Sequence, residues 1–413
     1  MHLKTPLLLI VALMFILPSA SSGEEPSSAE TWRPDPAKVE RYMKSRRGVQ
    51  AREEAVPEYT LPVILSSDGD WHTRRAELVE LFEKHVYGRA IPKPESLKTE
   101  TVEKTQLSTI PRGVCQRQRV TATMENGPFS FEYLLFAVEG EQWPVFVMIN
   151  NRDPELAMPD GENFSGFVPV KQILDAGFAL AVLQHNDVAP DNQENFREGI
   201  LDVVLPAGPR QPDAPGTIAA WSWGASRVLD SLEGNQLVDA SKAAIIGHSR
   251  GGKTALWTGA LDPRFSLVIS NNSGCMGAAI SRRRFGETVG VIGQRFERWF
   301  CPEFQQYANR EDELPVEQHQ LIALAAPRHV YVASADEDLW ADPRGEWLGL
   351  ANAHPVFESL GAKSITPTMT MPALNQPRNV GATSYHIRTG GHDLTEWDWQ
   401  QYLAVATRLW NSN

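Results

Sequence analysis

The sequence predicts an α/β fold, a three-layer sandwich in which helices cover both faces of a mostly parallel, eight-stranded sheet. Short apolar segments recur along the chain at helix-length intervals, an alternation typical of strands joined by crossover helices. Most of these segments are apolar throughout, as expected for strands that are buried on both faces. The 413 residues are 42% hydrophobic, so the chain has ample material for a large core.

The expected elements follow in order along the chain. Arg74–Pro92 has the pattern of an amphipathic helix that runs into a turn. The segments 115–123 and 129–138, joined by MENGP, predict an antiparallel hairpin. A helix is expected over Ala220–Leu232. Six further buried strands are predicted at 145–150, 178–184, 243–247, 266–272, 329–335 and 384–390.

The N-terminus has the pattern of a secretory signal. Lys4 precedes an apolar run over 7–17, and small residues follow, so we expect a signal peptide over residues 1–23. The apolar run is shorter than the roughly 20 residues of a membrane span. Residues 24–60 are interpreted as a linker and N-terminal wrap, and 61–413 as one large α/β domain. We therefore expect a secreted or periplasmic protein without a membrane span.

Charge and cysteine content restrict the partners. The formal net charge is −12, which gives no electrostatic support for nucleic-acid binding. The three cysteines, Cys115, Cys275 and Cys301, have no metal-site spacing, and a Cys275–Cys301 disulfide stays open. The sequence HDLTE at His392 lacks a second histidine at ligand spacing. We expect no metal site, and we predict a monomer.

One short motif points to nucleophilic catalysis. Gly247-His248-Ser249-Arg250-Gly251 fits G-x-S-x-G and lies between a predicted strand and a predicted helix. In that context the glycines permit a sharp turn that lifts the serine hydroxyl above the carboxyl edge of the sheet. The competing interpretation is a glycine-rich turn with Ser249 as a helix N-cap. We interpret Ser249 as the nucleophile.

The partners of such a serine follow it in the order acid, then histidine. His354 lies in a helical stretch and His386 inside the last strand, whereas His392 follows that strand in a loop, so His392 is preferred. The acid should follow the strand 329–335 and accept a hydrogen bond from the imidazole. Spacing leaves four candidates for the acid open: Asp336, Glu337, Asp338 and Asp342.

A longer set of motifs resembles a known family. In chain order these are GHSRGGK, SNNSGCMGAA, RRFGE, DLWADPRGE and GGHDLTEWDW, within roughly residues 60–410. The set is similar to the bacterial glucuronoyl esterases of carbohydrate esterase family fifteen. The resemblance implies an α/β-hydrolase fold, no cofactor, and cleavage of esters that join 4-O-methyl-glucuronic acid branches of xylan to lignin alcohols.

The resemblance also implies roles for individual residues. It makes Ser249 the nucleophile, His392 the base and Arg250 the cation beside the oxyanion. The family's acid follows one of two strands; one of these positions is Asn272 here, so the match assigns Asp338. Glucuronate recognition is implied for three residues, Lys253, Glu287 and Trp340.

Less specific interpretations remain beside each of these roles. Arg250 could form an ion pair with a nearby aspartate, and Lys253 could be a solvated surface lysine. Trp340 could pack as a loop residue, and Glu287 could pair with Arg283 or Arg284. At the level of function, the alternatives are an acetyl-xylan or general carboxylesterase, and an inactive carbohydrate-binding scaffold.

Overall fold

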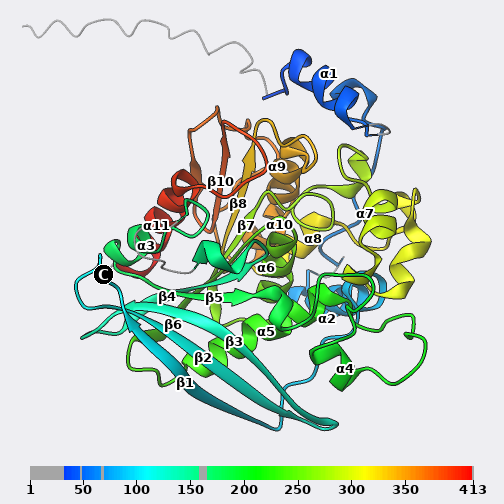
Figure 1. The fold of residues 1–413 in the computed structure, drawn as a ribbon. Helices are drawn as coiled ribbons and strands as arrows, with labels where there is room; N and C mark the ends of the chain where they lie inside the picture. The colour runs from blue at the N-terminus through cyan, green and yellow to red at the C-terminus, as the bar shows by residue number, and fades with distance from the viewer. Residues whose placement is uncertain (1–31, 47–48, 67–68, 158–164, 412–413) are drawn as a thin grey trace, which may run out of the picture. The chain divides into compact units, whose positions relative to one another are not determined.

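The computed structural model describes residues 32–46, 49–66, 69–157 and 165–411, which build a sheet between two layers of helices (Figure 1). The predicted signal peptide lies outside these residues. The order across the sheet is β1-β2-β3-β5-β4-β6-β7-β8-β10-β9. The strands are β1 (Ser96–Gln106), β2 (Gly113–Met124), β3 (Gly127–Val138), β4 (Trp143–Asn150), β5 (Ala179–Gln184), β6 (Val238–His248), β7 (Phe265–Asn271), β8 (His329–Ala335), β9 (Arg378–Val380) and β10 (Thr383–Arg388).

The described sheet has ten strands, so the predicted number of eight was wrong. The two strands that the sequence pattern missed are the edge strands β1 and β9. β1, with the sequence SLKTETVEKTQ, is largely exposed and polar, and β9 has three residues. An edge strand buries little, so its sequence carries little of the apolar signal on which the prediction relied. The predicted hairpin is confirmed as the antiparallel pair β2–β3.

The helices lie on both faces of the sheet, which confirms the predicted three-layer α/β architecture (Figure 1). α2 continues into a short π-helix, Glu83–Tyr87. The α-helices are α1 (Pro36–Ser45), α2 (Trp71–Phe82), α3 (Val170–Asp175), α4 (Ile200–Val204), α5 (Thr217–Leu232), α6 (Arg250–Leu261), α7 (Val289–Arg295), α8 (Gln318–Ala323), α9 (Pro343–Asn352), α10 (His354–Ser359) and α11 (Glu396–Asn411).

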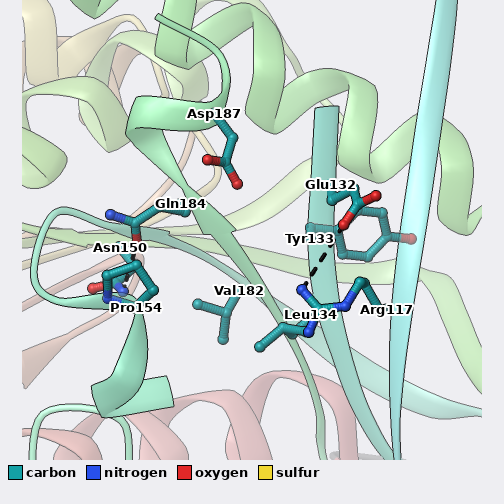
Figure 2. A pocket seen from close by; sticks show the side chains of 9 residues that line it. All are labelled: Arg117, Glu132, Tyr133, Leu134, Asn150, Pro154, Val182, Gln184 and Asp187. Carbon is teal, nitrogen blue, oxygen red and sulfur yellow. Dashed lines mark hydrogen bonds and ion pairs between the residues drawn. The ribbon is translucent and has the colours of Figure 1, made fainter. Parts of the chain in front are cut away.

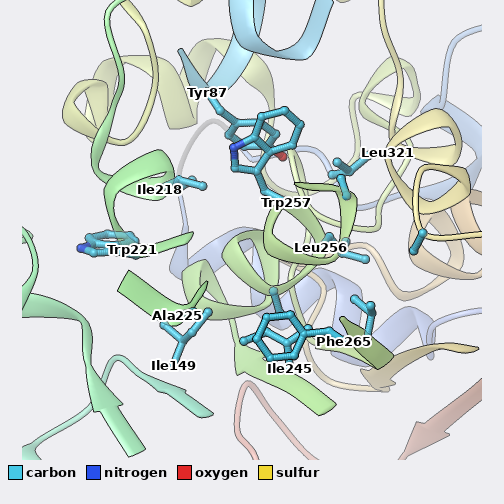
Figure 3. Packing of buried hydrophobic residues seen from close by; sticks show 14 of the residues in the cluster. Tyr87, Ile149, Ile218, Trp221, Ala225, Ile245, Leu256, Trp257, Phe265 and Leu321 are labelled. Atoms are coloured by element: carbon cyan, nitrogen blue, oxygen red, sulfur yellow. The ribbon is translucent and has the colours of Figure 1, made fainter. Parts of the chain in front are cut away.

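Two apolar cores hold the layers together. On one face, alternate strand residues such as Ile149 and Ile245 pack against α5 and α6, with Trp221 and Trp257 among the largest buried side chains (Figure 3). On the other face, the intervening strand residues pack against α3 and α11, which lie side by side in Figure 1. Successive strand residues point to opposite faces, so fully apolar strands are what a two-faced core requires.

The parallel part of the sheet brings distant parts of the sequence to one edge. β6, β7, β8 and β10 are neighbours and run parallel, so the segments that follow them meet at their carboxyl ends. Those segments begin with Ser249 after β6, Asn272 after β7, Asp336 after β8 and Thr389 after β10. Ligands of open α/β sheets bind at this edge, and the predicted site residues therefore converge there.

All three cysteines are buried free thiols, so the Cys275–Cys301 disulfide that the sequence left open is not formed. Burial raises the pKa of the Cys115 and Cys301 thiols to about 12, which keeps them protonated at neutral pH. None of the helices that the structure describes is long and apolar enough to cross a bilayer.

Candidate active site

The serine of the G-x-S-x-G motif sits in a strained turn between β6 and α6. Ser249 has φ 58° and ψ −122°, a left-handed region that few residues other than glycine adopt. A Cβ atom on Gly247 would lie 2.1 Å from the carbonyl oxygen of Gly251, so glycine is required there. Ser249 donates its backbone N–H to the Asn271 carbonyl at 2.9 Å rather than capping α6 through its side chain. This geometry matches the strained strand-to-helix turn that exposes a nucleophile.

A carboxylate and an imidazole meet beside this serine. His392 Nδ1 lies 2.6 Å from Asp338 Oδ2, and the same oxygen accepts a hydrogen bond from Asn272 Nδ2 at 2.8 Å. Asp338 is 3% exposed, whereas the His392 side chain is 35% exposed. A buried carboxylate on one imidazole nitrogen leaves the other nitrogen free to accept a proton.

The other three candidate acids have structural partners. Asp336 and Glu337 form ion pairs with Lys38, at 2.9 and 2.8 Å respectively. Asp342 accepts the Gly345 N–H at the start of α9 and is paired with Arg283. Of the four carboxylates that spacing left open, Asp338 is the one hydrogen-bonded to His392.

The other two candidate histidines also have structural positions. His386 is fully buried between the Tyr331 hydroxyl at 2.9 Å and the Asp398 carboxylate at 2.8 Å. Both ring nitrogens of this packed imidazole therefore have partners. His354 is the first residue of α10 and shares a hydrogen bond with Ser364.

Buried groups that the sequence analysis did not identify hold the His392 loop. Arg388 donates to the carbonyl oxygens of Gly391 and Asp393, at 3.0 and 2.7 Å, on either side of His392. The ring of His248 lies 4.4 Å from that of His392, centroid to centroid. Burial, together with the charge of His392, lowers the pKa of His248 well below its usual value, so a neutral ring supports the exposed one.

Arg250 begins α6 and is held by a carboxylate. Its guanidinium forms an ion pair with Asp191, which also accepts hydrogen bonds from Arg298 and Trp299 at 2.7 Å each. Burial favours the neutral acid, but the nearby His185 ring, 3.7 Å away, and the charge of Arg250 lower the pKa of Asp191. The ion pair that the sequence analysis considered for Arg250 is thus present. It fixes the guanidinium 5.0 Å from the Trp299 ring.

Lys253, Glu287 and Trp340 form one connected group. Lys253 Nζ lies 2.9 Å from Glu287 Oε2, and Trp340 Nε1 donates to Glu287 Oε1 at 3.0 Å. Lys253 is 3% exposed, so it is not a solvated surface lysine. Glu287 is paired with Lys253 and not with Arg283 or Arg284. Lys253 and Glu287 are buried and Trp340 is half-buried, and this hydrogen-bonded trio presents a rigid polar wall.

One cavity of about 270 Å³ collects these groups. Every residue for which the sequence predicted a role lines it: Ser249, Arg250, Lys253, Glu287, Asp338, Trp340 and His392. The sequence analysis missed several other lining residues, among them Arg46, Arg295, Phe296 and Trp299. Neighbouring cations and aromatic rings give the cavity the character of a carbohydrate or anion site.

A second, smaller cavity of about 90 Å³ lies at the carboxyl ends of β4 and β5 (Figure 2). A dashed line in Figure 2 marks the ion pair between Arg117 Nη1 and Glu132 Oε2, which lie 3.8 Å apart. Burial raises the pKa of Asp187 on its wall. None of the residues that the sequence singled out lines this cavity.

Glu346 of α9 is a buried carboxylate behind the site that the sequence analysis did not identify. Its Oε1 accepts the backbone N–H groups of Ser273 and Gly274, at 2.6 and 3.0 Å. Its Oε2 lies 2.6 Å from the Ser334 hydroxyl. Burial raises its pKa from 4.5 to about 8, so the side chain is protonated at neutral pH. It thereby braces the loop after β7 that carries Asn272.

Glu346→Gln is expected to reduce the pH dependence of the free energy of unfolding. Between the unfolded pKa of 4.5 and the folded value of about 8, the folded state holds a proton that the unfolded state has lost. Stability therefore falls as pH rises through this window, and a glutamine, which cannot titrate, removes that contribution. Urea unfolding at several pH values between 5 and 8 measures the slope.

Two results bear on this expectation for Glu346. Glu346→Ala should lower stability at every pH, because it leaves two buried backbone N–H groups without an acceptor. Equal slopes for wild type and Glu346→Gln would contradict the assignment of the titration to this residue.

Comparison with known proteins adds to this geometry. A family model described as "Glucuronyl esterase, fungi" matches residues 155–361. A protein named "Carbohydrate esterase MZ0003", from an unknown prokaryotic organism, is 35% identical over 91% of this chain and 94% of its own length.

Two solved bacterial structures are similar to this one. A glucuronoyl esterase from Solibacter usitatus is 36% identical with a TM-score of 0.79, covering 86% of this chain and all of that one. A promiscuous CE15 esterase from a marine bacterial metagenome is 33% identical with a TM-score of 0.77, covering 87% of this chain and 99% of that one.

Proposed function

Because the chain belongs to the glucuronoyl esterases of carbohydrate esterase family 15, we propose that it hydrolyses glucuronic acid esters through an acyl-enzyme on Ser249. It is a carboxylic ester hydrolase with an α/β-hydrolase fold. The observation that carries the proposal is the single cavity in which the Lys253–Glu287–Trp340 wall adjoins Ser249 and His392.

In the proposed first half-reaction, Ser249 Oγ attacks the ester carbonyl while His392 Nε2 takes its proton. Asp338, hydrogen-bonded to His392 Nδ1, stabilises the imidazolium that forms. His392 then returns the proton to the departing alcohol. In the second half-reaction a water, activated by His392, attacks the acyl group and releases free glucuronate.

The negative charge that develops on the carbonyl oxygen requires donors nearby. Arg250 lies at the N-terminus of α6, where backbone N–H groups point outward and the helix dipole favours negative charge. Its guanidinium adds a charged donor that Asp191 holds in a fixed orientation. A positive side chain is unfavourable at a helix N-terminus by about 0.3–1 kcal/mol, and the anionic transition state offsets this cost.

The sugar is proposed to lie against the Lys253–Glu287–Trp340 wall. The indole of Trp340 offers an apolar face to a pyranose ring. Lys253 and Glu287 offer a donor and an acceptor for ring hydroxyls. A lone acetyl group would leave this wall without a ligand, so the arrangement favours a uronate, with (4-O-methyl-)glucuronate esters of lignin–carbohydrate or glucuronoxylan type as substrates.

The test compares turnover of benzyl glucuronate with that of p-nitrophenyl acetate. Substantial turnover of the uronate ester is the expected result. Turnover of the acetate alone would favour an acetyl-xylan or general carboxylesterase, a possibility that the promiscuity of the marine relative keeps relevant. No turnover of either ester by folded protein would favour an inactive carbohydrate-binding scaffold.

Trp340→Ala is expected to lower kcat/KM for benzyl glucuronate by about 10- to 100-fold, through lost ring contact and the lost hydrogen bond to Glu287. The rate on p-nitrophenyl acetate should fall much less, because acetate has no sugar to contact the wall. Trp340→Phe keeps a ring but not the donor and should be intermediate. Equal losses on both esters would contradict a role in sugar recognition.

We also propose that the protein acts outside the cytoplasm. The support is the signal pattern over residues 1–23 and the polymeric nature of the proposed substrates. Sequencing of the mature N-terminus after expression with the natural leader tests this, with cleavage expected near residue 20 or 23.

A further inference from the structure

The mouth of the site cavity carries cations that the proposed chemistry does not use. Four basic side chains line the cavity: Arg46, Arg250, Lys253 and Arg295. Asp191 neutralises Arg250, and Glu287 neutralises Lys253. Across the part of the chain that the structure describes, neither Arg46 nor Arg295 forms an ion pair with a carboxylate. Both are exposed, so they lie at the opening rather than at the base of the cavity.

Arg46 reaches the cavity from the N-terminal segment, about 200 residues before the nucleophile in sequence. It follows α1 directly, and its guanidinium carbon lies 5.0 Å from the Trp340 ring centroid and 5.3 Å from that of Tyr42. Stacking on two rings restricts the guanidinium plane and leaves its edge free to donate hydrogen bonds. Arg46 is therefore positioned against the proposed sugar wall.

Helix α1 is itself fixed to the loops of the site. Lys38 bridges Asp336 and Glu337, and Asp336 accepts the Gly390 N–H at 2.8 Å, two residues before His392. Val39 packs in a small apolar cluster with Phe285 and Leu339. Phe285 lies two residues before Glu287 in the sequence, and Leu339 directly precedes Trp340. These contacts hold α1, and Arg46 directly after it, beside the loops that line the cavity.

Arg295 comes from another part of the chain, as the last residue of α7. Its guanidinium carbon lies 5.3 Å from the Phe296 ring centroid, and that ring stacks parallel on Trp299 at 3.9 Å. The helix dipole favours a cation at a helix C-terminus, and this explains an arginine at the end of α7. It does not explain why this arginine lines the cavity. Two guanidinium groups that have no carboxylate partner among the described residues thus line one cavity from two separate elements.

We propose that Arg46 and Arg295 bind a negatively charged group on the sugar next to the esterified glucuronate. The reacting ester is neutral, so its binding does not require these cations, whereas a carboxylate or sulfate on an adjoining sugar matches the fork of a guanidinium. The chain has a net charge of −12 and would otherwise repel an acidic polysaccharide. This inference rests on the proposed esterase function and specifies its substrate class as an acidic glycan.

The test uses two disaccharide methyl esters of glucuronic acid that differ only in the second sugar, which is either glucuronic acid or glucose. At low ionic strength, wild type is expected to show kcat/KM about 5- to 20-fold higher for the acidic ester, mainly through a lower KM. Salt at about 0.5 M should remove most of this preference, because exposed charges are then screened within a few ångströms.

Single substitutions then locate the effect. Arg46→Gln and Arg295→Gln should each lower the acidic-to-neutral ratio by about 2- to 5-fold, the range of partly exposed ion pairs. Arg41→Gln is the matched control, because Arg41 is an exposed residue of the adjoining helix α1 that does not line the cavity, and it should leave the ratio at the wild-type value. Arg46→Lys keeps the charge and should retain most of the preference.

Three results would overturn the proposal. Equal kcat/KM for the two esters in wild type would contradict it while leaving the esterase function intact. If Arg41→Gln lowered the acidic-to-neutral ratio as much as Arg46→Gln does, the preference would come from the overall charge of the protein and not from a specific site. Failure of wild type to hydrolyse either ester would contradict the proposed esterase function, and this inference with it.

Discussion

Replacing Ser249 by alanine is expected to lower kcat for benzyl glucuronate by about 10⁴- to 10⁶-fold. Without the hydroxyl no acyl-enzyme forms, and the remaining groups can only promote slow attack by water. Steady-state hydrolysis with enough protein to detect the residual rate measures the loss, and circular dichroism checks that the variant is folded.

The Ser249→Ala experiment has a specific control and a clear contrary outcome. Ser241→Ala removes a hydroxyl from an exposed position of the preceding strand, β6, and should leave kcat near the wild-type value. Alanine keeps the same left-handed backbone conformation that Ser249 adopts, so the strain is unchanged and stability should stay near the wild-type value. A folded Ser249→Ala protein with more than a tenth of the wild-type rate would exclude Ser249 as the nucleophile.

Asp338→Asn should lower kcat by about 10³- to 10⁴-fold with little change in KM. In the wild-type protein, Asp338 Oδ2 accepts hydrogen bonds from both His392 and Asn272. An amide in its place can present an N–H to His392 Nδ1, which places the imidazole proton on Nε2 and removes the base. The loss in kcat is measured on benzyl glucuronate at several pH values, because a tautomer effect should persist across the neutral range.

Asn272→Ala provides the comparison for Asp338→Asn. It removes one hydrogen bond to the carboxylate but leaves the contact with His392, so a loss of about tenfold is expected. If Asn272→Ala were as damaging as Asp338→Asn, the amide of Asn272 would have to contribute as much as the acid. If neither substitution mattered, the acid would lie elsewhere.

The central strands of the sheet were predictable because burial on both faces leaves a continuous apolar pattern. VFVMIN and FALAVLQ are examples, and they correspond to β4 and β5. The edge strands β1 and β9 were not predictable in this way, since an edge strand is held by backbone hydrogen bonds and needs no apolar side chains. The same reason explains why the predicted number of strands was too small.

Within the site, local sequence identified the residues whose role depends on a local conformation. Gly247 and Gly251 allow the turn that exposes Ser249, and this requirement is visible in five consecutive letters. The acid was different, because four carboxylates lie within seven residues and any of them has the right chemistry. Contact with His392 selects among them, and that contact joins residues 54 positions apart.

By itself, the sequence determined the layered α/β architecture and the serine in its strand-to-helix turn, because both depend on short-range patterns of apolar and glycine residues. Only the tertiary structure decided which carboxylate meets His392, that Asp191 holds Arg250, and that Arg46 reaches the cavity. The physical reason is that ion pairs and hydrogen bonds form between groups a few ångströms apart in space. The number of residues between two positions in the sequence does not determine their distance in the fold.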